Sequence, residues 1–371
     1  MRLSLEDHDK IPFHFQDYTV SSGRVTFKVK GEFEVDLTIA DEDFEKQFWF
    51  IDFRFLFTPA PQDLSEALRA FIEAKVNEAL ANDGLAGCYR FLHEFVLTHK
   101  INELSRQARE LSRERWIDSV RVERLNRAIS IQYWASRYPQ NGPKSWIIIG
   151  VNSGKKSSSY VDAKTTSSLT LRWFRDSKEV KDVDVLLDTE EVSAERLLKR
   201  VIARHIGHIL RTIYDKLQTK PRFMKREAAM TLRLDKDEPM LSALEVQLSY
   251  CEKIIARIDP ITGFFAMSPH SRVVYEGEHR LNYRSKDPAE EGLNSIEGIR
   301  CVSTMEELNR RGKSMGWIGS PRPIRPEDLR TIVNSREGVQ SIWFKREGWD
   351  PRWYLMLSLS LSGDHWWLVE L

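Results

Sequence analysis

The feature that most constrains the fold of this chain is a recurring pattern of short, aromatic-rich alternating strands followed by an amphipathic helix. The pattern spans residues 25–80 and returns over residues 129–217. Further strand sets are predicted at 230–267 and 342–371. Repeated units of this kind bury their apolar faces partly against their neighbours and usually build extended scaffolds. We therefore predict an α+β fold of tandem antiparallel β-meanders followed by amphipathic helices, forming an elongated scaffold.

The first unit shows the pattern most clearly. Apolar residues alternate with polar ones in two segments, Arg24–Lys30 and Glu32–Ile39, and again in the aromatic run Phe48–Phe57. Alternation with a period of two predicts strands that are buried on one face. Leucines, valines and isoleucines at helical spacing then predict one helix over 64–80 and a second over 85–111, with Gly84 as the stop between them.

The later strands and the domain boundaries are predicted in the same way. In the second unit, four strands are expected at Ile129–Trp134, Trp146–Val151, Leu169–Phe174 and Val183–Leu187. The basic segment Thr219–Glu227 reads as a linker. We predict an irregular leader over 1–22, a first repeat module over 23–220 and a second over 221–371. The last strand set has no helix after it, so the chain is expected to be part of a longer protein.

Composition limits the classes of function. The 371 residues include 56 Lys and Arg and 55 Asp and Glu, a formal net charge of +1. This balance argues against a dominant contact with a phosphate backbone, which needs a basic excess. Three separated cysteines without a CxxC pair indicate a reducing compartment. No signal peptide or membrane span is indicated, so the chain is expected to be soluble, in the cytosol or the nucleus.

Three patterns resemble chemical sites but do not complete one. The loop at 150–157 has three residues between its glycines, where a P-loop has four, and no helical pattern follows it. The histidine pairs His205/His208 and His93/His99 lack further ligands at a recognisable spacing. The acidic run 41–45 lacks the glycine and glutamate of a calcium-binding loop. We therefore predict no catalytic residue, cofactor or metal.

The segment Arg106–Arg127 is the most suggestive surface, because it carries seven arginines and a tryptophan. It is interpreted in three ways: a solvated helix face whose arginines pair with nearby acids, a docking face for a protein, or a nucleic-acid contact. The predicted protein-contact residues combine this segment with the apolar end of the chain. They are Trp116, Arg121, Arg124, Trp366 and Trp367.

Several long stretches resemble one known family. They include GEFEVDLTIADEDFEKQFWFIDFRFLF at 31–57, DGLAGCYRFLHEF at 83–95, GPKSWIIIGVNSGKK at 142–156 and the terminal WYLMLSLSLSGDHWWLVEL. In these stretches the chain is similar to the subunit 14 family of the Mediator complex, of the fungal type. The resemblance extends over nearly all of the chain from about residue 22, and the matching stretches are long enough to be specific.

The resemblance implies a nuclear, non-enzymatic coactivator subunit. In that family the subunit joins the head, middle and tail modules of Mediator, which passes signals from activators to RNA polymerase II. It implies other Mediator subunits as partners, contact with the polymerase and activators only indirectly, no direct specific DNA binding and no cofactor. Two rival hypotheses are an enzyme that uses the 150–157 loop for a phosphate ligand and a nucleic-acid-binding protein that uses Arg106–Arg127.

Overall fold

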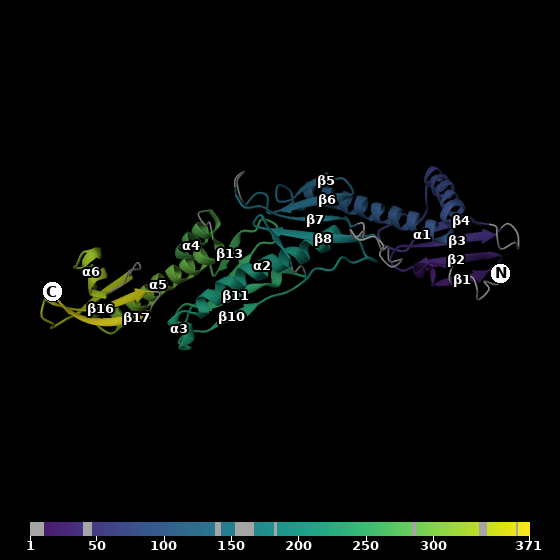
Figure 1. The fold of residues 1–371 in the computed structure, drawn as a ribbon. Helices are drawn as coiled ribbons and strands as arrows, with labels where there is room; N and C mark the ends of the chain where they lie inside the picture. The colour runs from purple at the N-terminus through teal and green to yellow at the C-terminus, as the bar shows by residue number, and fades with distance from the viewer. Residues whose placement is uncertain are drawn as a thin grey trace. The chain divides into compact units, whose positions relative to one another are not determined.

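The computed structural model describes residues 11–39, 47–137, 142–152, 167–181, 184–283, 287–333, 340–360 and 363–371. By their contacts, residues 1–198 and residues 199–371 form two compact units. Each unit contains antiparallel sheets whose strands follow one another in sequence order. This confirms the predicted α+β fold with repeated β-meanders (Figure 1). The predicted module boundary at 220/221 lies after this division and stays a prediction.

Unit 1 begins with a four-stranded sheet. A short 3-10 helix, η2 (Phe13–Phe15), precedes strands β1 (Tyr18–Ser21), β2 (Arg24–Val29), β3 (Phe33–Ile39) and β4 (Phe48–Phe55). The described end of the predicted irregular leader is therefore ordered, since η2 and β1 lie in it. One face of the sheet is apolar because Phe27, Val35 and Phe53 lie side by side in the register, and all three are buried.

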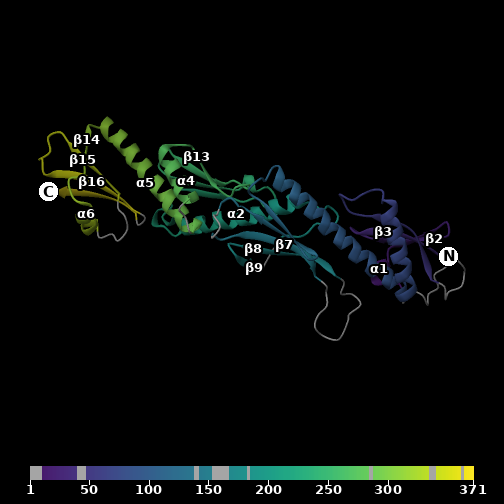
Figure 2. The same ribbon diagram turned by 90° about the horizontal axis from the view of Figure 1, so that it is seen from above.

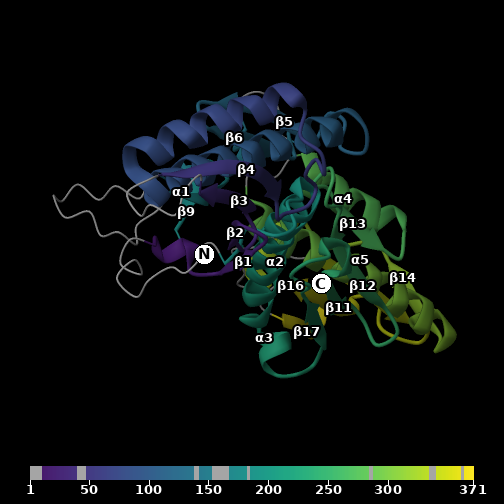
Figure 3. The same cartoon turned by 90° about the vertical axis from the view of Figure 1, so that its right-hand side faces the viewer.

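Helix α1 (Glu66–Arg113) consists of two helical segments that meet at a kink at Gly84, where the sequence predicted the stop between two helices. Ser65 caps its start, since its side chain accepts a hydrogen bond from the Leu68 amide. Gly84 has φ +59 and ψ -148, a non-helical conformation that glycine adopts without strain, and it separates the two helical segments. The helix lies along the first sheet and continues to the second sheet of unit 1 (Figures 2 and 3).

The second sheet of unit 1 has five strands in the order β5-β6-β7-β8-β9. Their bounds are β5 (Arg121–Leu125), β6 (Ala128–Tyr133), β7 (Ser145–Asn152), β8 (Ser168–Arg175) and β9 (Lys178–Val180). Two expectations were wrong here. The basic segment does not stay helical, because the helix ends at Arg113 and 121–125 pairs as a strand. Residues 184–187 are not a strand; the last strand is β9, which turns back at Asp176 and Ser177, two residues with positive φ.

The first part of unit 2 is a four-stranded sheet with helices around it. Helix α2 (Ala194–Gln218) enters the unit and is followed by α3 (Pro221–Met224), and the strands are β10 (Met230–Arg233), β11 (Ala243–Gln247), β12 (Lys253–Ile258) and β13 (Phe265–Ser268). A 3-10 helix, η3 (Pro239–Leu241), lies between β10 and β11. These strands match the predicted third set. Helix α4 (Arg272–Tyr283), in a stretch without a clear prediction, packs against β13.

The second part of unit 2 is a sheet held between two helices. Helix α5 (Pro288–Ser314) and helix α6 (Pro326–Val333) accompany strands β14 (Trp317–Ser320), β15 (Gln340–Arg346), β16 (Trp353–Ser360) and β17 (Gly363–Glu370). The predicted strands correspond to β15, β16 and β17, whereas β14 was not predicted. Gly292 weakens α5 by propensity but has a packing reason, because a Cβ there would lie 2.6 Å from the Ile213 side chain on α2.

Candidate interaction surfaces and the joint between two sheets

Three of the seven arginines in the predicted basic segment, Arg106, Arg115 and Arg127, pair with acidic neighbours. Arg106 pairs with Glu103 and Glu110, each at 2.6 Å, and Arg127 contacts Glu94. The guanidinium of Arg115 lies 3.7 Å from Glu195. Surface pairs such as these add little stability, but they reduce the net positive field that would attract a phosphate backbone. The geometry therefore favours a solvated, internally paired surface over a nucleic-acid contact.

The three predicted contact residues of this segment have different environments. Trp116 is only 3% exposed, and its backbone closes the turn between α1 and β5, so its indole supports the fold and is not available to a partner. Arg124 is exposed and donates a hydrogen bond of 2.9 Å to Asn102 on α1. Arg121 is exposed at the start of β5 and pairs in register with Gln132. Of the three, Arg121 and Arg124 remain accessible.

The other two predicted contact residues lie on the last strand of unit 2. Trp366 is 54% exposed and Trp367 is 37% exposed, and their neighbour Leu368 is 59% exposed. Large apolar side chains gathered at one sheet border are unusual on a protein surface and typical of interaction sites. The only hydrogen bond that holds an indole here is the one from Trp367 Nε1 to Ser358 Oγ, 3.1 Å, among the described residues.

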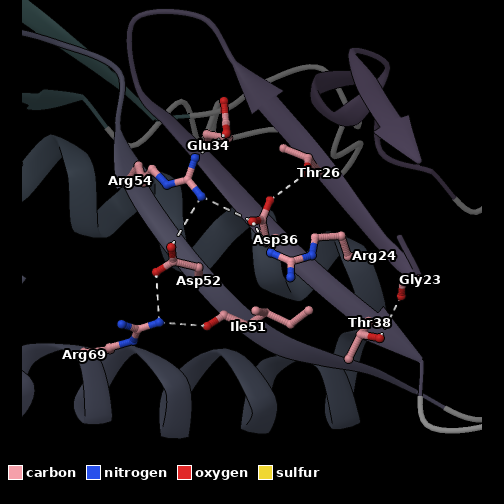
Figure 4. A network of polar contacts seen from close by, with 10 residues as sticks. All are labelled: Gly23, Arg24, Thr26, Glu34, Asp36, Thr38, Ile51, Asp52, Arg54 and Arg69. Carbon is pink, nitrogen blue, oxygen red and sulfur yellow. Dashed lines mark hydrogen bonds and ion pairs between the residues drawn. The ribbon is translucent and has the colours of Figure 1, made fainter. Parts of the chain in front are cut away.

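The first sheet of unit 1 presents a polar network on the face opposite its apolar one (Figure 4). Asp36 is the buried centre: it accepts a hydrogen bond of 2.6 Å from Thr26 Oγ1 and lies 3.4 Å from Arg54 Nη2. Arg54 also contacts Glu34 and Asp52, and Asp52 pairs with Arg69 on α1. Acidic and basic side chains alternate on this face, so it favours neither a strongly acidic nor a strongly basic partner.

A buried polar joint, formed by Gly31, Glu32, His93, Lys100, Ser167 and Thr189, connects the two sheets of unit 1 through α1. The ammonium of Lys100 donates to the Gly31 carbonyl at 2.7 Å and to the Thr189 carbonyl at 2.8 Å. It also lies 4.9 Å from the centre of the Phe57 ring. Because Lys100 is 1% exposed, burial lowers its pKa, while the carboxylates of Glu32 and Asp188 oppose that shift.

Gly31 allows the two sheets to approach each other at this joint. It turns the chain between β2 and β3 with φ +71. A Cβ at this position would lie 3.1 Å from Thr189 Oγ1, which follows the second sheet. Any other residue would therefore strain the turn, and its Cβ would push apart the two carbonyl groups to which Lys100 donates.

His93 forms the second half of the joint. Its Nδ1 lies 2.6 Å from the Glu32 carboxylate, and its Nε2 lies 2.6 Å from the Ser167 carbonyl oxygen. Both partners are acceptors, so both ring nitrogens are assigned as donors and the side chain is an imidazolium. Burial alone would lower the pKa of His93, but the hydrogen bond and charge of Glu32, the Ser167 carbonyl and Glu94 together raise it.

Sequence reasoning missed this joint, because it considered His93 only as a possible metal ligand. The signal for Lys100 was present: Val96, Lys100 and Leu104 follow one another at i, i+4 spacing, so Lys100 occupies the buried stripe of α1. The partners of Lys100 could not be found in this way, because both are backbone carbonyls far away in the sequence.

In the described part of the chain, the residues show neither a metal-binding group nor an activated buried thiol. Among those residues there is no group of three or more His, Cys, Asp or Glu side chains that could hold a metal ion. Burial raises the pKa of the Cys88 thiol to about 12 and that of Cys301 to about 11, so neither is an activated nucleophile. In the same residues no helix has both the length and the apolar character of a membrane span. The acidic run 41–45 and the loop residues after 152 lie outside the described residues.

Comparison with known proteins gives a consistent result over the whole chain. Residues 213–308 match the fungal Med14 domain, and residues 1–41 match Mediator complex subunit MED14. Mediator of RNA polymerase II transcription subunit 14 of Pyricularia oryzae is 53% identical over 375 residues, covering 100% of this chain and 34% of the relative. Its counterpart in Neurospora crassa is 52% identical over 383 residues, covering 100% and 30%.

A more distant relative supports the same grouping. The protein of that name in Emericella nidulans is 37% identical over 372 residues, covering 100% of this chain and 33% of the relative. The chain thus spans about a third of the length of these curated relatives. The match of residues 1–41 also includes the leader, which contributed little to the resemblance seen from the sequence alone.

Proposed function

Because the chain belongs to the Mediator subunit 14 family, we propose that it is a non-enzymatic architectural part of the Mediator coactivator in the nucleus. In this role it links the head, middle and tail modules and helps to relay activator signals to RNA polymerase II. Its direct partners are other Mediator subunits, and its contacts with the polymerase and activators are indirect. It needs no cofactor and makes no specific contact with DNA.

The observation that carries this proposal is the contrast between interior and surface. The interior of unit 1 ties two sheets and one long helix together through the joint around Lys100 and His93. The border of unit 2 at β17 exposes Trp366 and Trp367. A scaffold needs rigid spacing inside and apolar anchors outside, and tryptophan and arginine are the commonest anchors in protein interfaces.

Two surfaces are proposed as contact sites for other Mediator subunits. The first is the exposed part of β5 with Arg121 and Arg124, and the second is β17 with Trp366 and Trp367. Nucleic-acid binding through Arg106–Arg127 is the less favoured alternative, because Arg106, Arg115 and Arg127 already pair with acids. A steep loss of DNA affinity with rising salt would be required to support that alternative.

The test is co-purification from nuclear extract with the tagged chain, followed by mass spectrometry. The proposal predicts recovery of head and middle subunits by the wild-type chain and a clear loss with the double variant Trp366→Lys, Trp367→Lys. The control Ile318→Lys changes an apolar residue that is 60% exposed, at the opposite border of the same sheet. Recovery of no Mediator subunit by the folded wild-type chain would contradict the proposal.

A further inference from the structure

Helix α4 packs against α5 and β13 with one of its faces (Figure 2). Val274 and Leu281 on this inner face are buried. Gly277 lies so close to α5 that a Cβ there would come within 2.9 Å of the Ile299 side chain. The Ser295 hydroxyl of α5 donates to the Gly277 carbonyl at 3.2 Å. The inner face of α4 is therefore fixed, and its other face is directed outward.

The outward face of α4 carries a row of aromatic rings. Tyr275, His279 and Tyr283 follow one another at i, i+4 spacing, which places them one above the other on the helix. The two tyrosines are 67% and 66% exposed, and His279 is exposed as well. The ring centres are 6.3 Å apart from Tyr275 to His279 and 4.9 Å apart from His279 to Tyr283. The half-buried ring of Phe264, 5.4 Å from Tyr283, completes what we call the aromatic row.

Exposed helix residues elsewhere in this chain are mostly charged and paired. On α1, Lys75 pairs with Glu78 at 2.8 Å, and Arg106 pairs with Glu110 at 2.6 Å. An isolated exposed tyrosine such as Tyr250 is ordinary on a protein surface. A contiguous row of four rings is different, because contiguous apolar patches indicate binding and tyrosine is enriched at the centre of interfaces. The outward face of α4 is therefore a candidate contact surface.

The border of the neighbouring sheet does not offer a partner a place for an added strand. At β13, the Asn282 side chain accepts a hydrogen bond from the Phe265 amide at 2.8 Å and donates one to the Phe265 carbonyl at 3.0 Å. Glu278 accepts a third bond, from the Met267 amide, at 2.9 Å. Side chains of α4 thus replace a neighbouring strand. A partner at the aromatic row meets side chains and not free backbone groups.

The shape of the aromatic row favours a helix as the partner. From Tyr275 to Tyr283 the row covers eight residues of α4, roughly 12 Å at 1.5 Å per residue. Side chains at i, i+4 spacing form a ridge, and such a ridge packs into the groove between the side-chain rows of a second helix. The partner helix then needs apolar side chains at i, i+3 or i+4 spacing on the stripe that faces the rings.

A row of charged side chains runs beside the aromatic row and leaves one positive charge. Arg272 Nε lies 3.3 Å from the Glu276 carboxylate, so these two charges offset each other. Arg280, one turn further along, is exposed and belongs to no ion pair in the described part of the chain. Glu278 does not face Arg280, because residues two apart on a helix point in different directions. Arg280 therefore favours an Asp or Glu on the partner.

We propose that the aromatic row of α4 docks an amphipathic α-helix of another protein chain, whose apolar stripe packs on Tyr275, His279 and Tyr283. An Asp or Glu of that helix lies next to Arg280. This inference rests on the proposed function for the identity of the partner, a Mediator subunit. It adds a third contact surface and the binding mode, which is helix against helix.

The test is photo-crosslinking in Mediator assembled with the full chain. A benzophenone amino acid replaces His279 at the centre of the aromatic row, and in the control it replaces Tyr250, which is 86% exposed between β11 and β12. We expect the label at 279 to cross-link to a helix of another subunit that has an apolar stripe and an acidic residue. Its yield should be at least tenfold higher than that of the label at 250.

Variants that carry the label at 279 test the chemistry of the site. The double variant Tyr275→Lys, Tyr283→Lys should lower the cross-link yield at least tenfold, whereas Tyr250→Lys should leave it unchanged. Arg280→Glu should lower the yield several-fold, and Arg280→Lys should keep most of it. Unchanged hydrogen exchange of the β13 amides shows that α4 stays in place in each variant. Equal yields with Arg280→Glu and with Arg280 would contradict the acidic residue on the partner.

The outcomes separate this inference from the proposed function. If the wild-type chain co-purifies with head and middle subunits but the label at 279 reaches no other chain, the inference is wrong and the proposed function stands. Cross-links to another segment of the same chain, to a second copy or to a segment that is not helical would also overturn the inference. Recovery of no Mediator subunit by the folded wild-type chain would overturn both.

Discussion

Two regions of this protein depart from the usual rule that apolar residues are buried and charged residues are exposed. One region buries charged side chains, and the other exposes apolar ones. The joint in unit 1 buries charges, with Lys100 and His93 almost inaccessible to solvent, whereas β17 in unit 2 exposes tryptophans. In the joint, both cations have acceptors at hydrogen-bond distance. At β17, the side chains of Trp366, Trp367 and Leu368 are each more than one third exposed. Buried charge that is fully bonded holds a structure together, while exposed apolar surface indicates binding.

The largest effect is expected from breaking the buried joint. Lys100→Met keeps the approximate length of the side chain but leaves the carbonyls of Gly31 and Thr189 without their donor. The loss of the buried bond to Gly31 and of the partly buried bond to Thr189 should lower the free energy of unfolding of unit 1 by about 2–4 kcal/mol. The matched control is Lys75→Met on the same helix, where an exposed pair with Glu78 is lost at a cost of about 0.5 kcal/mol or less.

Denaturant unfolding followed by hydrogen exchange in β3 measures this difference. Equal stabilities of the Lys100 and Lys75 variants would show that the buried amine contributes nothing to the joint. The claim that buried charges hold unit 1 together would then be wrong.

The next effect comes from converting a protected sheet border into an open one. Asn282→Ala removes the side chain that pairs with both backbone groups of Phe265, a buried residue of β13. We expect unit 2 to lose about 1–3 kcal/mol and the amides of β13 to exchange faster. The control Asn294→Ala changes an exposed asparagine on α5. If β13 stayed as protected as before, side-chain capping would not explain the protection of this border.

A smaller effect is expected from pH. Because the pKa of His93 is raised in the folded state, its contribution to stability is fully present below its ordinary value of 6.5. The contribution is lost as the pH rises through the raised pKa. In that window the folded state binds more protons than the unfolded state, so stability should fall with rising pH, by at most about 1.4 kcal/mol per pH unit.

The neighbouring charges around His93 are Glu32, Glu94 and His14. Unfolding of unit 1 measured from pH 5.5 to 8.5 tests the sign, with His93→Gln as the variant that should remove this slope. A stability that rises through this range in the wild-type chain, or a slope that His93→Gln leaves unchanged, would rule out the imidazolium assignment.

The smallest effect on stability is expected at β17. Trp366→Lys changes a mostly exposed side chain, so the free energy of unfolding of unit 2 should change by about 0.5 kcal/mol or less. The solubility of the chain should rise, because a lysine on a border strand opposes association. Thermal unfolding and a precipitation assay measure the two effects. A loss of several kcal/mol would mean that Trp366 belongs to the core. Strand β17 would then stabilise the fold, as the joint does, and would not be a binding surface.

The strand pattern was predictable because its signal is local. Alternation in Phe48–Phe57 and Ile254–Ile258 depends only on neighbouring residues and on one buried face, and both strands formed where expected. The strand that follows α1 was not predictable in the same way. The residues after Arg113 keep a helical charge pattern, but pairing of 121–125 with β6 competes with it, and tertiary contacts decided the outcome.

The candidate surfaces were predictable only in part. Trp366 and Trp367 were identified from composition at a strand border, and they are exposed. Trp116 was chosen as the tryptophan of the arginine-rich segment Arg106–Arg127, and it is buried, since sequence does not show which side of a turn faces the core. The joint depends on backbone carbonyls of Gly31, Ser167 and Thr189, which carry no side-chain signal at all.

The most direct test of the central claim is amide hydrogen exchange of β17 in the free chain and in assembled Mediator that contains this protein. The account predicts that residues 363–370 gain at least tenfold protection in the assembly, whereas the joint around Lys100 is equally protected in both states. Unchanged exchange of β17 in an assembly that contains the head and middle subunits would contradict the account, because the border would then remain open where its partner should be.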